Sequence, residues 1–241
     1  MAELPANDTM PSYRQKMQSM LESGRFSDFT LVVGPPGQEQ KEFNVYRVHL
    51  SACSPVFNAM FSNANTKEVL EKRAIIEDVS AATMRRMLTY FYTGELKYDL
   101  ETEKEGPLFE LLYAADKYQV NLLKAQCEML LGNLITVNSV FTTLQYAELH
   151  NALTLKERCL DFIVNNSDRV VSRDTESAWA QFEAAARPEL LKDIFYRMAK
   201  KKVNQTSIVE NSNAISESVS QVEELDSLTG PILLSFLHRV A

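Results

Sequence analysis

The chain has 241 residues, of which 45% are hydrophobic and 24% are charged, a balance typical of a globular protein with a substantial core. The formal net charge of −7 gives no support to nucleic-acid binding, which needs clustered Lys and Arg. No apolar run is long enough to span a bilayer, and residues 1–11 lack a signal-peptide pattern. Cys53, Cys127 and Cys159 lie far apart, as expected of reduced thiols. We therefore predict a soluble intracellular protein of the cytoplasm or nucleus.

An amphipathic helix is predicted near the N-terminus, ahead of any strand. Tyr13, Met17, Met20 and Leu21 recur at helical spacing, and Gly24 follows as a stop signal. A helix this short is marginal alone, so we expect it to pack against another surface.

The next segment has the alternating pattern of a β-hairpin. Apolar residues alternate along 29–33 and again along 43–45, and residues 34–37, Gly-Pro-Pro-Gly, are predicted to form the turn between them. Asp28 stands at the start of the first strand. Arg47 is expected to close the second.

A short helix, a loop and a third strand are predicted to follow the hairpin. Ser54 can cap a helix that begins at Pro55. Residues 62–72 are polar and are predicted to be a loop, and residues 74–76 form a short apolar strand. Ser80 is then expected to cap a longer helix, which Thr93-Gly94 closes.

The rest of the chain is predicted to be helical up to about residue 202. Residues 203–228 contain few large apolar side chains and are predicted to be a flexible linker, as residues 1–11 are predicted to be disordered. Residues 229–241 regain apolar character. They are predicted to form an amphipathic helix that binds a partner protein or docks on the helices of its own chain.

Four pieces of sequence together resemble the BTB/POZ domain: Phe26-Ser-Asp-Phe-Thr-Leu, Leu50-Ser-Ala-Cys-Ser-Pro-Val-Phe, Tyr90-Phe-Tyr-Thr-Gly-Glu and Leu112-Tyr-Ala-Ala-Asp-Lys-Tyr. The resemblance spans residues 12–133 and implies an α+β fold, a small sheet with a cluster of helices. Residues 134–202 resemble the helical extension called BACK. The speckle-type POZ subgroup is the most similar. Its substrate-binding MATH domain, and kelch repeats, are expected to be absent.

The resemblance implies a dimer interface that includes the N-terminal helix and a charged pair. Met17, Met20 and Leu21 are expected to pack against a second subunit, and Asp28 and Arg47 to shape a pocket at that interface. The alternative for the apolar residues is a place in the core of their own chain. For the charged pair it is an ordinary surface ion pair, worth at most about 1 kcal/mol.

The resemblance also implies a surface for the cullin-3 scaffold of a ubiquitin ligase. Members that bind cullin carry a hydrophobic residue, any residue, then Glu in the loop that here follows Met60 and Phe61. The nearest fits here are Thr66-Lys67-Glu68 and Val69-Leu70-Glu71. The candidate contact residues are Met60, Phe61, Thr66, Glu68, Val69, Glu71 and Tyr118. The alternative is that Met60 and Phe61 are core residues and that the loop has no partner.

No catalytic motif, phosphate-binding loop or zinc-ligand spacing is found, so neither an enzyme nor a cofactor or metal is predicted. We predict a protein-interaction module, an adaptor that dimerises with itself or with another BTB protein and links an unknown protein substrate to cullin-3. The alternatives are a BTB scaffold without ligase function, such as a transcription-related protein, or a truncated partner that dilutes a full-length adaptor.

Overall fold

The computed structural model describes residues 12–37, 40–99, 104–170, 176–185, 187 and 190–201. In chain order the elements are α1 (Tyr13–Ser23), β1 (Phe29–Val33), β2 (Lys41–Val45), α2 (Arg47–Cys53), α3 (Pro55–Ser62), α4 (Lys67–Glu71), β3 (Arg73–Ile76), α5 (Ala81–Thr93), α6 (Glu105–Lys117), α7 (Asn121–Asn133), α8 (Val140–Leu149), α9 (Leu153–Asn165), α10 (Ser167–Val170) and α11 (Glu176–Ala185). Residues 190–201 are also helical. The predictions for residues 1–11, 203–228 and 229–241 lie outside the described residues.

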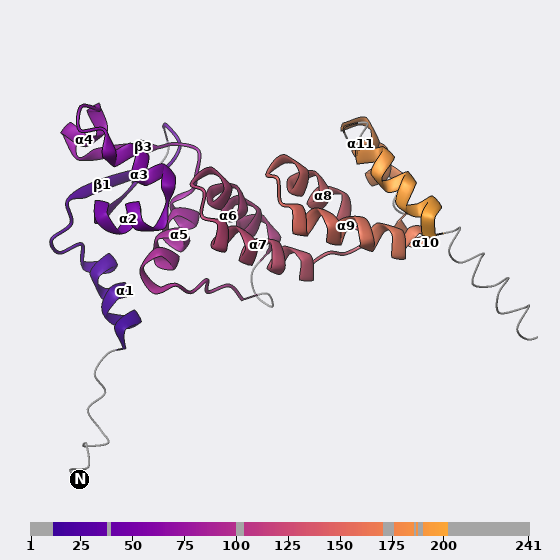
Figure 1. The fold of residues 1–241 in the computed structure, drawn as a ribbon, viewed down its shortest axis with the longest axis horizontal. Helices are drawn as coiled ribbons and strands as arrows, with labels where there is room; N and C mark the ends of the chain where they lie inside the picture. The colour runs from indigo at the N-terminus through magenta and orange to yellow at the C-terminus, as the bar shows by residue number, and fades with distance from the viewer. Residues whose placement is uncertain are drawn as a thin grey trace, which may run out of the picture.

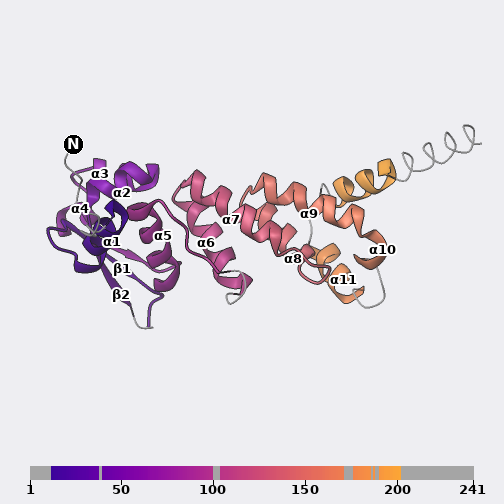
Figure 2. The ribbon, with the colours of Figure 1, turned by 90° about the horizontal axis from the view of Figure 1, so that it is seen from below.

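Figures 1 and 2 show an elongated molecule, with the sheet and α1–α5 at one end and α8–α11 at the other. The three strands lie in the order β2-β1-β3, with β1 antiparallel to β2 and parallel to β3. Leu31 stands opposite both Phe43 and Ala74, and all three are buried. The predicted hairpin and third strand are confirmed.

Helix starts and stops follow the predicted capping residues. Ser54 and Ser80 each accept a hydrogen bond from a backbone N–H three residues later, and Pro55 occupies the first turn of α3. Gly24 and Gly94 end α1 and α5 in the left-handed conformation, which glycine adopts without steric cost.

The prediction that Arg47 closes the second strand is wrong, because β2 ends at Val45 and Arg47 opens α2. Tyr46, at the cap position, provides no side-chain hydrogen bond. The Asp28 carboxylate accepts the Arg47 backbone N–H instead, at 2.8 Å. The first N–H groups of a helix need such acceptors. Here the acceptor comes from the start of the preceding hairpin, which the local sequence pattern does not reveal.

The prediction that residues 62–72 form a loop is also partly wrong. A short helix, α4, lies within this segment and ends at Lys72 in the left-handed conformation. Lys67 and Glu71 form an exposed ion pair of 3.9 Å along it. A helix of this length is too short to show a helical repeat of apolar residues, so the polar composition favoured a loop.

The helices form a continuous stack in which α5 packs against α1 and α6, α6 against α7, and α9 against α7 and α8. The largest fully buried side chains on these elements include Met84, Met87, Leu88, Leu108, Leu111, Leu112, Leu123 and Leu131. Cys127 and Cys159 are free and buried, and burial raises the pKa of each thiol to about 12. These thiols are therefore structural.

A guanidinium joins α9 to the end of α7. Arg158 donates to the Met129 carbonyl at 3.1 Å and to Asn133 Oδ1 at 2.9 Å. It fits because residue 132 is glycine: a Cβ there would lie 2.4 Å from Arg158 Nη1. Gly132 therefore leaves room for the contact that fastens α9 to the sheet-containing end of the molecule.

Gly106→Ala is expected to raise the free energy of unfolding by about 1–2 kcal/mol more than Gly132→Ala does. Alanine in a helix is favoured by about 1 kcal/mol, and nothing lies within 4 Å of a Cβ at Gly106. At position 132 the same gain is offset by the two Arg158 hydrogen bonds, each worth about 1 kcal/mol. Urea denaturation measures both variants. In an Arg158→Ala background the two substitutions should become equal, and an unchanged difference there would contradict this account.

Candidate protein-interaction surfaces

Helix α1 packs on its own chain with one face and exposes a second, apolar face. Leu21 is buried in the core, and Arg14 pairs with Glu95 just after α5. Tyr13, Met17 and Met20 are spaced i, i+4, i+7 and lie on one stripe. Met17 is half-buried, whereas 74% of Tyr13 and 41% of Met20 are exposed. We call these three residues the α1 stripe. Leu21, predicted as an interface residue, is a core residue here.

Asp28 and Arg47 form the predicted pair. In addition to the backbone bond, Arg47 Nε donates to Asp28 Oδ2 at 3.0 Å. The two side chains remain 44% and 34% exposed. Burial alone would raise the pKa of Asp28, but the hydrogen bonds and charge of Arg47 outweigh it, and the pKa is lowered. The pair therefore anchors α2 to β1 at the surface of the chain.

Two strongly exposed apolar residues adjoin this pair in sequence and were missed. They are Phe26, in a left-handed turn with the Arg25 guanidinium over its ring, and Val48, the second residue of α2. The signal for Val48 was hidden by the prediction that β2 continued through Arg47. Both residues extend the apolar surface available to a partner.

Asp28→Asn is expected to lower the melting temperature at pH 7 and to have little effect once the pH is below the folded-state pKa of Asp28. Because the folded-state pKa of Asp28 is lowered, its stabilisation is present above the unfolded pKa and is lost as pH falls through the folded pKa. For a pair this exposed the effect is at most about 1 kcal/mol. Calorimetry across pH 2–7 measures it. Glu77→Gln, at an exposed position, is the control. A pH-dependent change in its melting temperature as large as that of Asp28→Asn would contradict this role for Asp28.

Met60, Phe61 and α4 form a second candidate surface. Met60 and Phe61 are half-buried, and the Phe61 ring packs edge-on against Phe29 with centroids 4.8 Å apart. Thr66 stands at the cap position of α4, with its hydroxyl donating to the Asn63 carbonyl.

On α4 itself Val69 is half-buried, whereas Glu68 and Glu71 are exposed. Leu70 is 70% exposed. It was absent from the predicted contacts because a loop gives no reason to expect an outward apolar residue. We call Glu68, Leu70 and Glu71 the α4 surface.

Tyr118 does not belong to an exposed surface. It is only 2% exposed, and its ring stacks on Phe57 at a centroid distance of 4.6 Å. Its carbonyl accepts a hydrogen bond from the Ser54 hydroxyl at 2.6 Å. Burial raises the pKa of the phenol. Tyr118 thus holds α3 against the end of α6, and its prediction as a contact residue is wrong for this chain.

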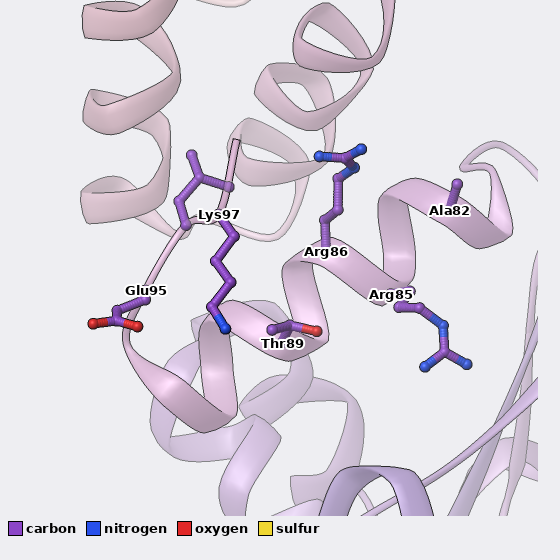
Figure 3. A pocket seen from close by; sticks show the side chains of 7 residues that line it. Ala82, Arg85, Arg86, Thr89, Glu95 and Lys97 are labelled. Atoms are coloured by element: carbon purple, nitrogen blue, oxygen red, sulfur yellow. The ribbon is translucent and has the colours of Figure 1, made fainter. Parts of the chain in front are cut away.

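A pocket of about 320 Å³ opens beside α5. Its lining residues, drawn in Figure 3, are Ala82, Arg85, Arg86, Thr89, Glu95, Leu96 and Lys97. We call it the basic pocket. The pocket was not predicted from the sequence, although the Arg85-Arg86 pair and Lys97, three residues beyond Gly94, are signals of positive charge.

The described residues contain no group of three or more His, Cys, Asp or Glu side chains able to hold a metal ion. Within the same ranges, no helix has the length and apolar character needed to cross a membrane.

The family model of the BTB/POZ domain matches residues 17–134. These residues form a BTB/POZ domain. The match covers the sheet, α2–α7, the α4 surface and the part of α1 from Met17 onward. The fold is therefore that of an α+β BTB/POZ domain followed by helices, as predicted.

Several known proteins are similar to this chain. BTB and MATH domain-containing protein 40 of Caenorhabditis elegans is 30% identical over 208 residues, which cover 86% of this chain and 50% of that protein. BTB and MATH domain-containing protein 42 of the same organism is 32% identical over 158 residues, 66% of this chain and 37% of that protein. A BTB/POZ domain-containing protein of Arabidopsis thaliana is 28% identical over 61% of this chain and 51% of its own length. The chain thus spans about half the length, or less, of these relatives.

Two solved structures of BTB domains are also similar. The BTB domain of zebrafish PATZ1 is 25% identical, with a TM-score of 0.37, over 48% of this chain and 85% of that domain. The BTB domain of human gigaxonin is 24% identical, with a TM-score of 0.36, over 53% of this chain and 96% of that domain.

Proposed function

We propose that the chain is a dimeric adaptor that links a protein substrate to a cullin-3 ubiquitin ligase. A BTB/POZ domain is a protein-interaction module. An adaptor of this kind does not transfer ubiquitin, but raises the effective concentration of the substrate near the enzyme that does. The observation that carries the proposal is the α4 surface, which presents an exposed Leu70 between carboxylates. The resemblance implies a cullin contact in this segment.

The α4 surface has the composition of a small binding site. Binding energy at protein interfaces concentrates in a few apolar anchors surrounded by polar residues that exclude water. Leu70 is suited to be the anchor, and Glu68 and Glu71 form the rim. The α4 helix packs against β3. A rigid support of this kind reduces the ordering cost of binding.

The α1 stripe supplies the proposed dimer contact. A two-fold dimer uses the same patch on both subunits, so an apolar stripe on one helix is self-complementary. Methionine adapts its shape to such contacts. The partner is a second copy of the chain or another BTB protein.

The helices beyond residue 134 are proposed to be a BACK-like extension, with the speckle-type POZ proteins as the most similar subgroup. Substrate would be held by these helices, by residues beyond 202, or by a partner subunit. Arg197 ties residues 190–201 to α9 through Glu157, at 2.5 Å, and Asp161, at 3.2 Å. This extension therefore provides a second binding platform fixed to the BTB domain.

One observation favours a BTB scaffold without ligase function, or a partner that dilutes a full adaptor. In the motif of a hydrophobic residue, any residue and Glu, the first position is occupied by the polar Thr66 or by the half-buried Val69. Neither presents a fully exposed apolar side chain. Cullin binding separates this alternative from the adaptor.

Leu70→Asp is expected to weaken binding of the N-terminal part of cullin-3 by at least tenfold, about 1.4 kcal/mol. The reason is the loss of the apolar anchor and the addition of a third carboxylate between Glu68 and Glu71. Calorimetric titration of the full chain measures the change. Leu122→Asp on α7, where leucine is equally exposed, is the matched control and should bind as the unaltered chain does. Equal affinities for Leu70→Asp and Leu122→Asp would contradict a role for the α4 surface.

A further inference from the structure

The basic pocket concentrates positive charge on a chain whose net charge is −7. Among the described residues that line it, Arg85, Arg86 and Lys97 are cationic, and Glu95 alone is acidic. Glu95 is already paired with Arg14 from α1. The pocket therefore has an excess of positive charge that fits an acidic ligand.

Aromatic rings lie under two of the cations that line the pocket. Arg85 lies over the Phe43 ring, 5.3 Å from its centroid, and Arg86 over Tyr98 at 5.1 Å. The contact with Phe43 orients the Arg85 guanidinium without neutralising it. Figure 3 shows the two arginines leaving α5 in different directions while Lys97 extends toward Thr89. Within the described residues, neither Arg85 nor Lys97 forms an ion pair.

The lining of the same pocket also contains apolar side chains, Ala82 on α5 and Leu96 in the segment after it. A ligand that satisfies both kinds of lining residue needs carboxylates for the cations and a branched apolar side chain for Ala82 and Leu96. Burial of one leucine side chain contributes about 1.5–3 kcal/mol. The chemistry recognised is thus an acidic peptide segment that contains leucine.

The chain itself contains such a segment beyond the described residues. Residues 203–238 include five carboxylates and neither Lys nor Arg. Three of those carboxylates, Glu223, Glu224 and Asp226, flank Leu225. Residues 222–228 read Val-Glu-Glu-Leu-Asp-Ser-Leu, which combines the two properties that the pocket requires.

The connection from residue 201 is long enough to reach the basic pocket. Packed helices lie about 8–10 Å apart, so the four steps from α5 through α6, α7 and α9 to residues 190–201 span at most about 40 Å. A helix of the length of α5 adds about 20 Å along its axis. The twenty residues 202–221 extend to about 70 Å. The tether therefore permits docking within one chain.

We propose that residues 222–228 of the same chain dock on the basic pocket, with Glu223, Glu224 and Asp226 beside its cations and Leu225 against Ala82 and Leu96. The contact occupies the outer face of α5 and covers Lys97. It makes that face unavailable to other acidic partners until the segment is displaced. Because Arg85 and Lys97 are exposed, the contact weakens as the salt concentration rises.

The test uses a fluorescein-labelled peptide of residues 220–230 and three full-length proteins. The first is the unaltered chain. The second has a neutral tail, Glu223→Gln, Glu224→Gln and Asp226→Asn. The third adds Lys97→Glu to the neutral tail. Fluorescence anisotropy is expected to show peptide binding to the neutral-tail chain, at least tenfold weaker binding to the unaltered chain, whose own segment competes, and no binding after Lys97→Glu.

Lys67→Glu in the neutral-tail chain is the control, because Lys67 is an exposed lysine on α4, away from the pocket. It should bind the peptide as the neutral-tail chain does. Failure of the neutral-tail chain to bind, or equal binding after Lys97→Glu, would overturn the proposal. Equal affinity for a peptide of the same charge in which Leu225 is replaced by Ser would show a general acidic partner instead, and would overturn the assignment to this segment.

Discussion

Tyr118→Ala is expected to lower the free energy of unfolding by about 3–5 kcal/mol, the usual cost of removing a large buried aromatic ring. The Tyr118 ring stacks on Phe57, which is itself fully buried and packs edge-on against Phe91. Its loss would open a cavity where α3, α5 and the end of α6 meet. Urea denaturation followed by circular dichroism measures the change.

Two controls separate this packing role from a binding role for Tyr118. Tyr118→Phe keeps the stacked ring and should cost less than about 1 kcal/mol. Tyr196→Ala removes an exposed ring of the same kind, and surface changes usually stay within about 0.5 kcal/mol. A Tyr118→Ala chain as stable as the Tyr196→Ala chain would contradict the core placement.

Met20→Asp is expected to weaken dimerisation at least a hundredfold, about 2.7 kcal/mol. Two-fold symmetry places the substitution in the interface twice, so each dimer loses two apolar contacts and gains two like charges. Met20 is 41% exposed, whereas the neighbouring Leu21 is buried, so the chain itself should remain folded. Sedimentation equilibrium at several concentrations measures the association constant.

Ser19→Asp is the matched control for Met20→Asp. Ser19 is an exposed neighbour on α1 and lies on another side of the helix from the α1 stripe. It should leave the association constant unchanged. If Met20→Asp associates as tightly as Ser19→Asp, the α1 stripe is not the dimer contact.

The sequence predicts the elements of this fold best where one helix or strand carries its own signal. Gly24, Ser54, Ser80 and Gly94 act through hydrogen bonds or backbone angles within a few residues, and each marks the boundary that was expected. The start of α2 fails because its cap, Asp28, lies nineteen residues earlier in the chain. A hydrogen-bond acceptor that lies far away along the chain produces no periodic pattern in the sequence.

The candidate sites also differ in whether the sequence alone reveals them. The pairing of Asp28 with Arg47 follows from the resemblance and is present in the structure. Tyr118 and Leu21 are buried in this chain, which the sequence does not reveal, because a motif gives residue identity but not the side of the backbone that faces solvent. Leu70 was missed for the converse reason, since only the short α4 helix turns it outward. The basic pocket is formed by α5 and by the chain beyond Gly94, so neither segment alone reveals it.

The most direct test of the adaptor is a titration of the full chain with the N-terminal part of cullin-3, by calorimetry combined with light scattering. If the chain is a dimeric adaptor, we expect a Kd of about 1 μM or below and the mass of a complex with two copies of each protein. The absence of binding by a folded dimer would contradict the adaptor and leave a BTB scaffold or a diluting partner as the function.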